Sequence, residues 1–147
     1  MAETLPKLLR EIASSYADYN AQLSKDSEGQ FQPTTYRELY RRVQECAAGL
    51  RAIGVSRGEH VGLTSENRAE WLITDFAVMS IGAVDVPRGN DVTTQEIAYI
   101  LGFGDCPTVV VENQIQLDKV LSTHGELPDL KRLIILDARV DASAVKV

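Results

Sequence analysis

Four short apolar stretches, separated by helical patterns, constrain the fold of this chain most strongly. They occupy residues 60–64, 83–86, 108–111 and 133–136. Strands that are apolar throughout are buried on both faces, and strands that are joined by helices run parallel. Because such crossovers are right-handed, the pattern favours an α/β fold with a doubly wound, mainly parallel sheet and helices on both faces.

Helical periodicity fills the segments between these strands and also begins the chain. The expected helices cover about residues 4–19, 35–54, 66–81, 93–103 and 114–121, whereas residues 138–147 show no period. Thr35 with Glu38 and Thr93 with Glu96 have the spacing of a capping box, in which each residue's side chain binds the other's N–H. A hairpin turn is expected at Ser27-Glu28-Gly29, so an N-terminal helix and a short hairpin precede the sheet.

Length and charge exclude several classes of protein. The chain has 147 residues and no linker-like stretch, so we expect no domain boundary inside it. No apolar run approaches the roughly 20 residues of a membrane-spanning helix, and the first ten residues do not resemble a secretion signal, which favours the cytoplasm. A net charge of −6 argues against a nucleic-acid partner, which requires a basic face.

The cysteines and histidines give no sign of a metal site. Cys46 and Cys106 lie far apart without CxxC spacing, which is typical of buried thiols in a reducing compartment. His60 and His124 have no second ligand three or four residues away. We therefore expect no metal-binding residue.

The stretch SIGAVDVPRGN is either the edge of a ligand site, because α/β folds bind ligands where strands end, or simply the place where a strand ends. Its apolar run stops at Pro87, which we expect at the carboxyl end of a central strand. Gly89 is expected to adopt a turn conformation that a side chain would strain. Arg88 could bind an anion, but a local salt bridge with Asp85 or Asp91 is the favoured interpretation.

Two further stretches have a simpler structural explanation than ligand binding. Ser65-Glu66-Asn67-Arg68 follows a strand, where phosphate loops occur, but it has no glycine and Glu66 would repel phosphate, so a helix cap is favoured. Gly102-Phe103-Gly104 closes a helix rather than opening one, which indicates a C-cap and turn. We therefore expect no catalytic or cofactor-binding residue in the chain.

Taken together, the segments from PTTYREL to TTQEIAYIL resemble the early part of an AMP-forming adenylating enzyme of the acyl-adenylate superfamily. The resemblance rests on Thr35-Tyr36-Arg37-Glu38-Leu39, on the helix that ends LRAIGV and on the run of residues 80–87. SENRAEW and VDVPRG are most similar to long-chain fatty-acyl-CoA synthetases. The resemblance extends over residues 5–137.

The resemblance implies that residues 1–147 form an N-terminal fragment of the large adenylating domain, inside a larger multidomain fold. The family's phosphate loop, adenine motif, Mg-holding Glu and catalytic Lys would all lie beyond this segment, so the fragment alone would be inactive. The complete enzyme would use ATP, Mg and CoA to convert a fatty acid into its thioester. The partners implied are the rest of the polypeptide and these substrates, and membrane contact through the remaining part stays open.

Two alternatives remain open. The chain could be a free-standing α/β interaction module without catalysis, or the start of a peptide-synthetase adenylation domain, which passes the acyl group to a carrier protein. The coding sequence after Val147 distinguishes them: a Ser/Thr/Gly-rich loop ending in Pro-Lys-Gly supports an adenylating enzyme, whereas a natural stop codon supports the module.

Overall fold

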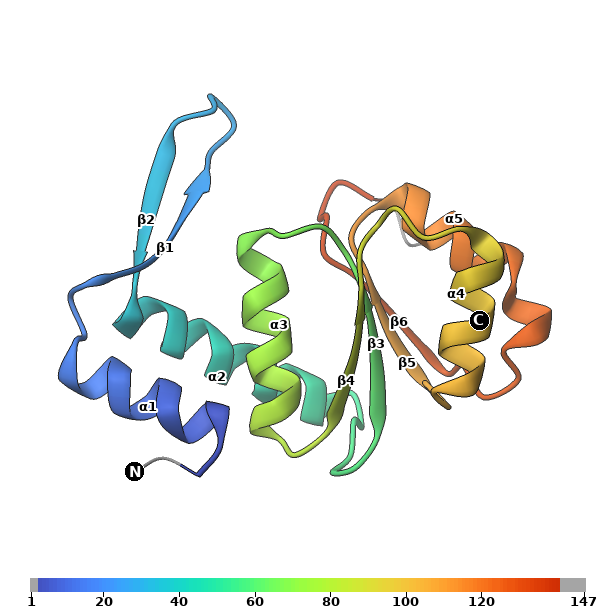
Figure 1. Ribbon diagram of the computed structural model, residues 1–147, viewed down its shortest axis with the longest axis horizontal. Coiled ribbons are helices and arrows are strands. Elements are labelled where there is room, and N and C mark those ends of the chain that lie inside the picture. The colour runs from blue at the N-terminus through green and yellow to red at the C-terminus, as the bar shows by residue number, and fades with distance from the viewer. Residues whose placement is uncertain (1–2, 141–147) are drawn as a thin grey trace. The chain divides into compact units, whose positions relative to one another are not determined.

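The computed structural model describes residues 3–140 (Figure 1). The final residues, 141–147, for which the sequence predicts no element, lie outside the described range. The chain forms two compact units, one from Met1–Ser56 with Arg68–Gly82 and the other from Arg57–Asn67 with Ala83–Val147. The expectation of a single domain fragment without an internal boundary stays a prediction.

The first unit consists of three helices and a β-hairpin. Its elements are α1 (Leu5–Ser15), β1 (Asn20–Lys25), β2 (Phe31–Thr35), α2 (Tyr36–Ala52) and α3 (Ala69–Ser80). β1 and β2 pair in antiparallel orientation, as the sequence predicts. Asp26 shapes the turn between them, because its carboxylate accepts the backbone N–H groups of Glu28 and Gln30, each at 2.9 Å. Gly29 lies in the left-handed region with a φ of 78°.

The helix starts follow the predicted caps in part. The Thr93 hydroxyl and the Glu96 carboxylate form the complete capping box. Thr35 caps α2 by accepting the Glu38 N–H at 3.2 Å, but the carboxylate of Glu38 binds Arg41 and Arg42. The predicted second box is therefore only half formed, because two guanidinium groups on the same helix face compete for that carboxylate.

The second unit contains a four-stranded parallel sheet with the order β4-β3-β5-β6. Its strands are β3 (His60–Thr64), β4 (Val84–Arg88), β5 (Thr108–Val111) and β6 (Arg132–Ile135), and its helices are α4 (Thr94–Phe103), α5 (Gln114–Ser122) and the 3-10 turn η1 (His124–Glu126). The chain passes from β3 to β4 in one direction and then crosses back to β5 and β6. This reversal is the connectivity of a doubly wound sheet. The α/β fold class predicted from the sequence is confirmed.

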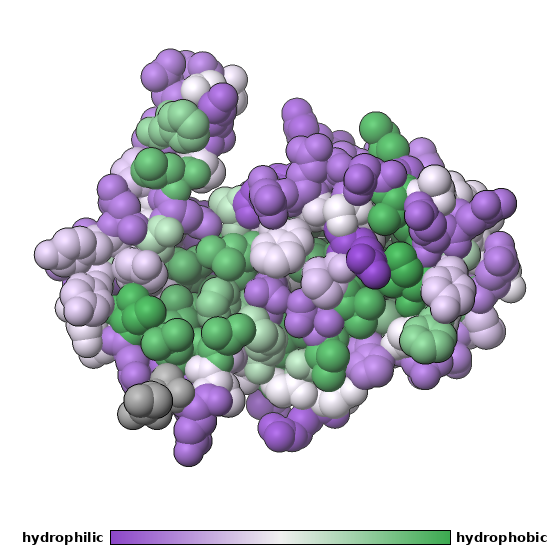
Figure 2. Space-filling model, viewed as in Figure 1, coloured by the Kyte–Doolittle hydropathy of each residue, from purple (hydrophilic) through white to green (hydrophobic). Residues whose placement is uncertain are grey.

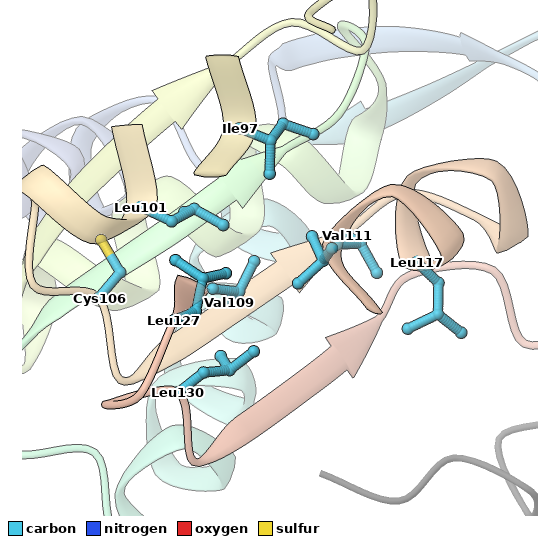
Figure 3. Packing of buried hydrophobic residues seen from close by; sticks show 9 residues of the cluster. Ile97, Leu101, Cys106, Val109, Val111, Leu117, Leu127 and Leu130 are labelled. Atoms are coloured by element: carbon cyan, nitrogen blue, oxygen red, sulfur yellow. The ribbon is translucent and has the colours of Figure 1, made fainter. Parts of the chain in front are cut away.

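The core of this unit lies between β5 and the helices α4 and α5. Figure 3 shows its buried side chains converging from α4, β5, α5 and the segment before β6. Val109, Val111 and Leu117 have no exposed surface. The cluster consists of Ile97, Leu101, Cys106, Val109, Val111, Leu117, Val120, Leu127 and Leu130. β5 is buried along its whole length and β3 nearly so, as the sequence predicts. β6 is only half-buried and β4 is partly exposed within the described residues, which differs from the expectation.

The position of β4 differs from the expectation. β4 lies at one end of the described sheet rather than in its centre, and it continues through Pro87 to Arg88. The Val84 N–H donates to Glu59 and the Arg88 carbonyl accepts from Ser65, so the even-numbered residues of β4 bond to β3. The nitrogen of Pro87 therefore points away from β3. Because no ladder bond is lost there, the proline does not end the strand.

Candidate functional site

The loops at the carboxyl ends of three strands are joined by one carboxylate. Glu112 directly follows β5, and its Oε2 accepts the backbone N–H of Glu66 at 3.2 Å and the side-chain amide of Asn90 at 3.1 Å. Glu66 lies after β3 and Asn90 lies after β4. Ligands of open α/β sheets bind at this edge, so the three loops form the candidate site.

Helix α5 fixes the loop after β4 from a second direction. The Lys119 ammonium donates to the carbonyl oxygens of Asn90 and Val92 at 2.9 and 2.8 Å, and the Gln116 amide donates to Asn90 at 3.1 Å. Gln116 is 3% exposed. Its Oε1 has no donor within hydrogen-bonding distance among the described residues. The loop is therefore held rigidly, and one amide oxygen under it is left without a hydrogen bond.

We expect Lys119→Met to lower the free energy of unfolding by about 1–3 kcal/mol, because two hydrogen bonds from a charged donor are lost at a half-buried position. Chemical denaturation measures this change, and amide hydrogen exchange of residues 89–93 should become faster. Lys131→Met is the matched control, since that side chain is exposed. Equal small changes in both variants would mean that Lys119 does not hold the loop.

The stretch Ser65-Glu66-Asn67-Arg68 precedes α3, but none of its side chains caps the helix as we expected. α3 begins at Ala69, and its N-cap residue is Arg68, without a side-chain capping bond. The Ser65 hydroxyl instead donates to the Glu66 carbonyl at 2.9 Å. The Glu66 N–H, which a phosphate would need, is occupied by a carboxylate. A phosphate at this position would have to displace the Glu112 carboxylate.

The turn after β4 also differs from the expectation. No ion pair joins Arg88 to Asp85 or Asp91 among the described residues, so the favoured salt bridge is wrong. The Arg88 side chain is exposed. The pKa of Glu96 is lowered mainly by hydrogen bonds from Thr93 and to a smaller extent by the positive charge of Arg88. Gly89 is not among the glycines with positive φ, so the expected backbone strain is absent.

The Gly-Phe-Gly stretch closes a helix, as the sequence predicts. Gly104 is the C-cap residue of α4, and its N–H donates to the Ile100 carbonyl at 2.9 Å. Phe103 is 79% exposed and its ring stacks on Tyr99, with the centroids 5.8 Å apart. This stretch is therefore a helix end and carries no dinucleotide loop.

Of the cysteines and histidines, Cys106 and His60 both contact the carbonyl oxygen of Gly104, and the Cys106 Sγ lies 3.6 Å from it. Cys106 is buried and Cys46 is half-buried, and both are free thiols. Burial, assisted by the charge of Asp105, raises the pKa of Cys106 to about 11, so its thiol is a poor nucleophile. The His60 Nδ1 lies 2.5 Å from the Gly104 carbonyl oxygen. Residues 3–140 contain no group of three His, Cys, Asp or Glu residues that could hold a metal ion.

Sequence reasoning missed two polar clusters. The Glu112 bridge is one, and the other lies at the amino ends of the strands, where Glu59 Oε1 accepts from Thr108 at 2.7 Å and from Arg132 at 2.9 Å. Glu59 and Arg132 are 73 residues apart in the chain. No local spacing identifies such a pair, although a charged residue at the start of an apolar strand is a weak signal.

A family model and several curated proteins match most of this chain. The family model described as AMP-binding enzyme matches residues 9–146. The long-chain-fatty-acid–CoA ligase ACSBG2 of Xenopus laevis is 31% identical over 131 residues, which are 89% of this chain and 18% of that protein. A chloroplastic long-chain-fatty-acid–[acyl-carrier-protein] ligase, AEE15 of Arabidopsis thaliana, is 28% identical over 134 residues, 91% of this chain and 18% of that protein.

Solved structures support the same relationship. The crystal structure of a protein described as a putative long-chain-fatty-acid CoA ligase from Rhodopseudomonas palustris superposes with a TM-score of 0.80 and 28% identity. The match includes 92% of this chain and 33% of that one. The chain thus spans about a fifth of the length of the curated relatives that it matches. Within the described residues, no helix is both long and apolar enough to cross a bilayer.

Proposed function

Since the chain belongs to the AMP-binding enzyme family, we propose that it forms the N-terminal scaffold portion of a long-chain fatty acid–CoA ligase. The observation that carries the proposal is the match of nearly the whole chain to long-chain-fatty-acid–CoA ligases, of which it spans 18%. The doubly wound sheet is consistent with this role, because such a sheet supplies the frame on which an adenylating site is built.

In the complete enzyme, a fatty acid carboxylate attacks the α-phosphate of ATP, which forms an acyl adenylate and releases pyrophosphate. The CoA thiolate then attacks the acyl carbon, and AMP leaves as the thioester forms. We assign no catalytic, cofactor-binding or metal-binding residue to this chain. We propose that the rest of the enzyme holds ATP, Mg and CoA. One observation supports this for the phosphates: the N–H of Glu66, which follows β3, already binds the Glu112 carboxylate.

The contribution of the described residues is to hold loops in place. Glu112 connects the segments after β3 and β4, and Lys119 fixes the loop of residues 90–92 from α5. Arg88 stands exposed beside this loop and is the first residue of the chain to test in the complete enzyme for contact with substrate. We place the enzyme in the cytoplasm.

The test begins with the reading frame after Val147, where we expect a Ser/Thr/Gly-rich loop ending in Pro-Lys-Gly. The complete protein should then release pyrophosphate and form acyl-CoA from ATP, Mg, CoA and a long-chain fatty acid. The isolated chain should release no more pyrophosphate than buffer does. A stop codon directly after Val147, or turnover by the pure chain, would refute the proposal.

A second candidate differs only in the acyl acceptor. The similarity to the chloroplastic acyl-carrier-protein ligase favours a carrier protein in place of CoA. Release of AMP from the complete enzyme, measured with CoA and with a phosphopantetheinylated carrier protein in parallel, distinguishes the two. Faster acyl transfer to the carrier would replace the CoA assignment.

A further inference from the structure

The first unit contains a hollow of about 330 Å³ with an unusual set of polar groups. It lies among α1, α2 and the end of α3. Its lining consists of Pro6, Lys7, Arg10, Tyr40, Gln44, Ala47 and Ser80. The volume is at the lower end of the range of roughly 300–1,000 Å³ that is typical of small-molecule sites. The hollow is an open depression of the surface, since four of its seven lining residues are exposed, and its volume is sufficient for a small organic ligand.

The lining groups are hydrogen-bond donors from three different helices. Lys7 and Arg10 are one turn apart on α1, and Tyr40 and Gln44 are one turn apart on α2, so each pair shares a helix face. Ser80 adds a hydroxyl from the last residue of α3. Two cations and three neutral donors thus surround the same space, and no carboxylate lines it among residues 3–140. This is notable in a chain of net charge −6.

Most of these donors have no partner within the described part of the chain. The side chains of Arg10, Tyr40, Gln44 and Ser80 make no hydrogen bond or ion pair to any residue that the structure describes. Lys7 donates to Glu3 at 2.6 Å, but both side chains are exposed, 49% and 79%. An exposed pair of this kind contributes little and is readily exchanged for another anion.

We propose that this hollow binds a phosphate monoester, as part of a small molecule or of a lipid headgroup. A phosphate dianion offers oxygen acceptors to the guanidinium, ammonium, hydroxyl and amide donors, and the guanidinium of Arg10 can bind two of these oxygens at once. Pro6 and Ala47 supply apolar contact for the organic part of the ligand. Leu5 and Leu8, in the first turns of the same helix α1, are 55% and 43% exposed and offer apolar surface to the acyl chains of a lipid.

The proposal goes beyond the adenylating function and does not depend on it. The hollow lies within the first unit, whereas the Glu112 loops belong to the second. Binding is measured without turnover, so a failure of the ligase assignment leaves this proposal standing, and the reverse also holds.

Isothermal titration of the protein with glycerol 3-phosphate tests the proposal, with glycerol and sodium sulfate as reference ligands. We expect saturable binding of glycerol 3-phosphate that is tighter than that of sulfate, which lacks the organic part, and no binding of glycerol. Arg10→Gln should weaken it by about tenfold or more, because a bidentate charged contact is lost. Tyr40→Phe, which removes one hydroxyl and keeps the ring, should weaken it by a smaller factor. Circular dichroism establishes that each variant folds.

Arg51→Gln is the matched control, because Arg51 lies in the last turn of α2, outside the hollow, and the change in net charge is identical. Its affinity should be unchanged. Co-sedimentation with phosphatidylcholine vesicles, with and without phosphatidic acid, tests whether the hollow binds a lipid headgroup. Binding to soluble ester alone identifies a metabolite, and binding to phosphatidic acid vesicles alone identifies a headgroup. No binding in either arm, or equal losses in Arg10→Gln and Arg51→Gln, would overturn the proposal.

Discussion

Replacing Leu117 with alanine is expected to lower the free energy of unfolding by about 2–5 kcal/mol. Leu117 has no exposed surface and belongs to the cluster formed with β5 and α4 (Figure 3). The substitution removes the apolar contacts of its side chain and leaves a cavity that the surrounding strands and helices can close only in part. Urea denaturation followed by circular dichroism measures the loss as a lower midpoint at unchanged slope.

Ile115→Ala provides the control on the same helix. Ile115 is 65% exposed, so its removal should change the free energy of unfolding by no more than about 0.5 kcal/mol. Similar losses in the two variants would mean that the face of α5 that packs on the sheet has been assigned wrongly.

The elements of the fold could be predicted because their signals are local. β3 and β5 have the predicted bounds, since a short apolar run between turn residues reports directly on a buried strand. The capping box at Thr93 depends on only four residues, and it is formed completely. Helix propensity, helix caps and strand burial all depend on residues that are close together in the sequence. The secondary structure could therefore be predicted from the sequence.

The order of the strands in the sheet was harder to predict, because it depends on which neighbouring strand each crossover connection places the next strand beside. Nothing between β3 and β4 encodes that β4 lies at one end of the described sheet. Its own composition gave a partial hint: Val84 is 45% exposed, and Pro87 is tolerated where only one side of a strand is paired. Within the described sheet, Pro87 therefore indicates a strand that is paired on one side and not the end of a central strand.

The candidate site could not be assembled from the sequence, because its contacts are long-range. Glu112 meets the Glu66 N–H 46 residues away, and Lys119 reaches the Val92 carbonyl 27 residues away. Pairings of this kind follow from the register of parallel strands and from the packing of α5, and neither leaves a local motif. The exposed apolar surface of the hairpin is likewise not part of any local motif. Figure 2 shows apolar groups along the hairpin below a hydrophilic tip. Leu23 in β1 and Phe31 in β2 are 59% and 62% exposed.

Gly62→Val is expected to destabilise the protein by about 3 kcal/mol or more. Gly62 lies in the middle of β3, and a Cβ atom added there would be 2.5 Å from Leu101 Cδ2 and 3.3 Å from Val109 Cγ2. Leu101 is 3% exposed and Val109 is fully buried, so neither can move without displacing other core atoms. Val favours strands, but that preference is much smaller than the cost of overpacking. Thermal or urea denaturation measures the loss.

Two comparisons separate this steric cause from a general intolerance of substituted glycines. Gly89→Val should have an effect below about 1 kcal/mol, because a Cβ there meets only the flexible Asp91 carboxylate, at 2.8 Å. Gly62→Ala should cost less in a Leu101→Val background than alone, since valine lacks the Cδ2 atom that the new methyl group would meet. Strictly additive losses in that double-mutant cycle would show that contact with Leu101 is not what requires glycine at position 62.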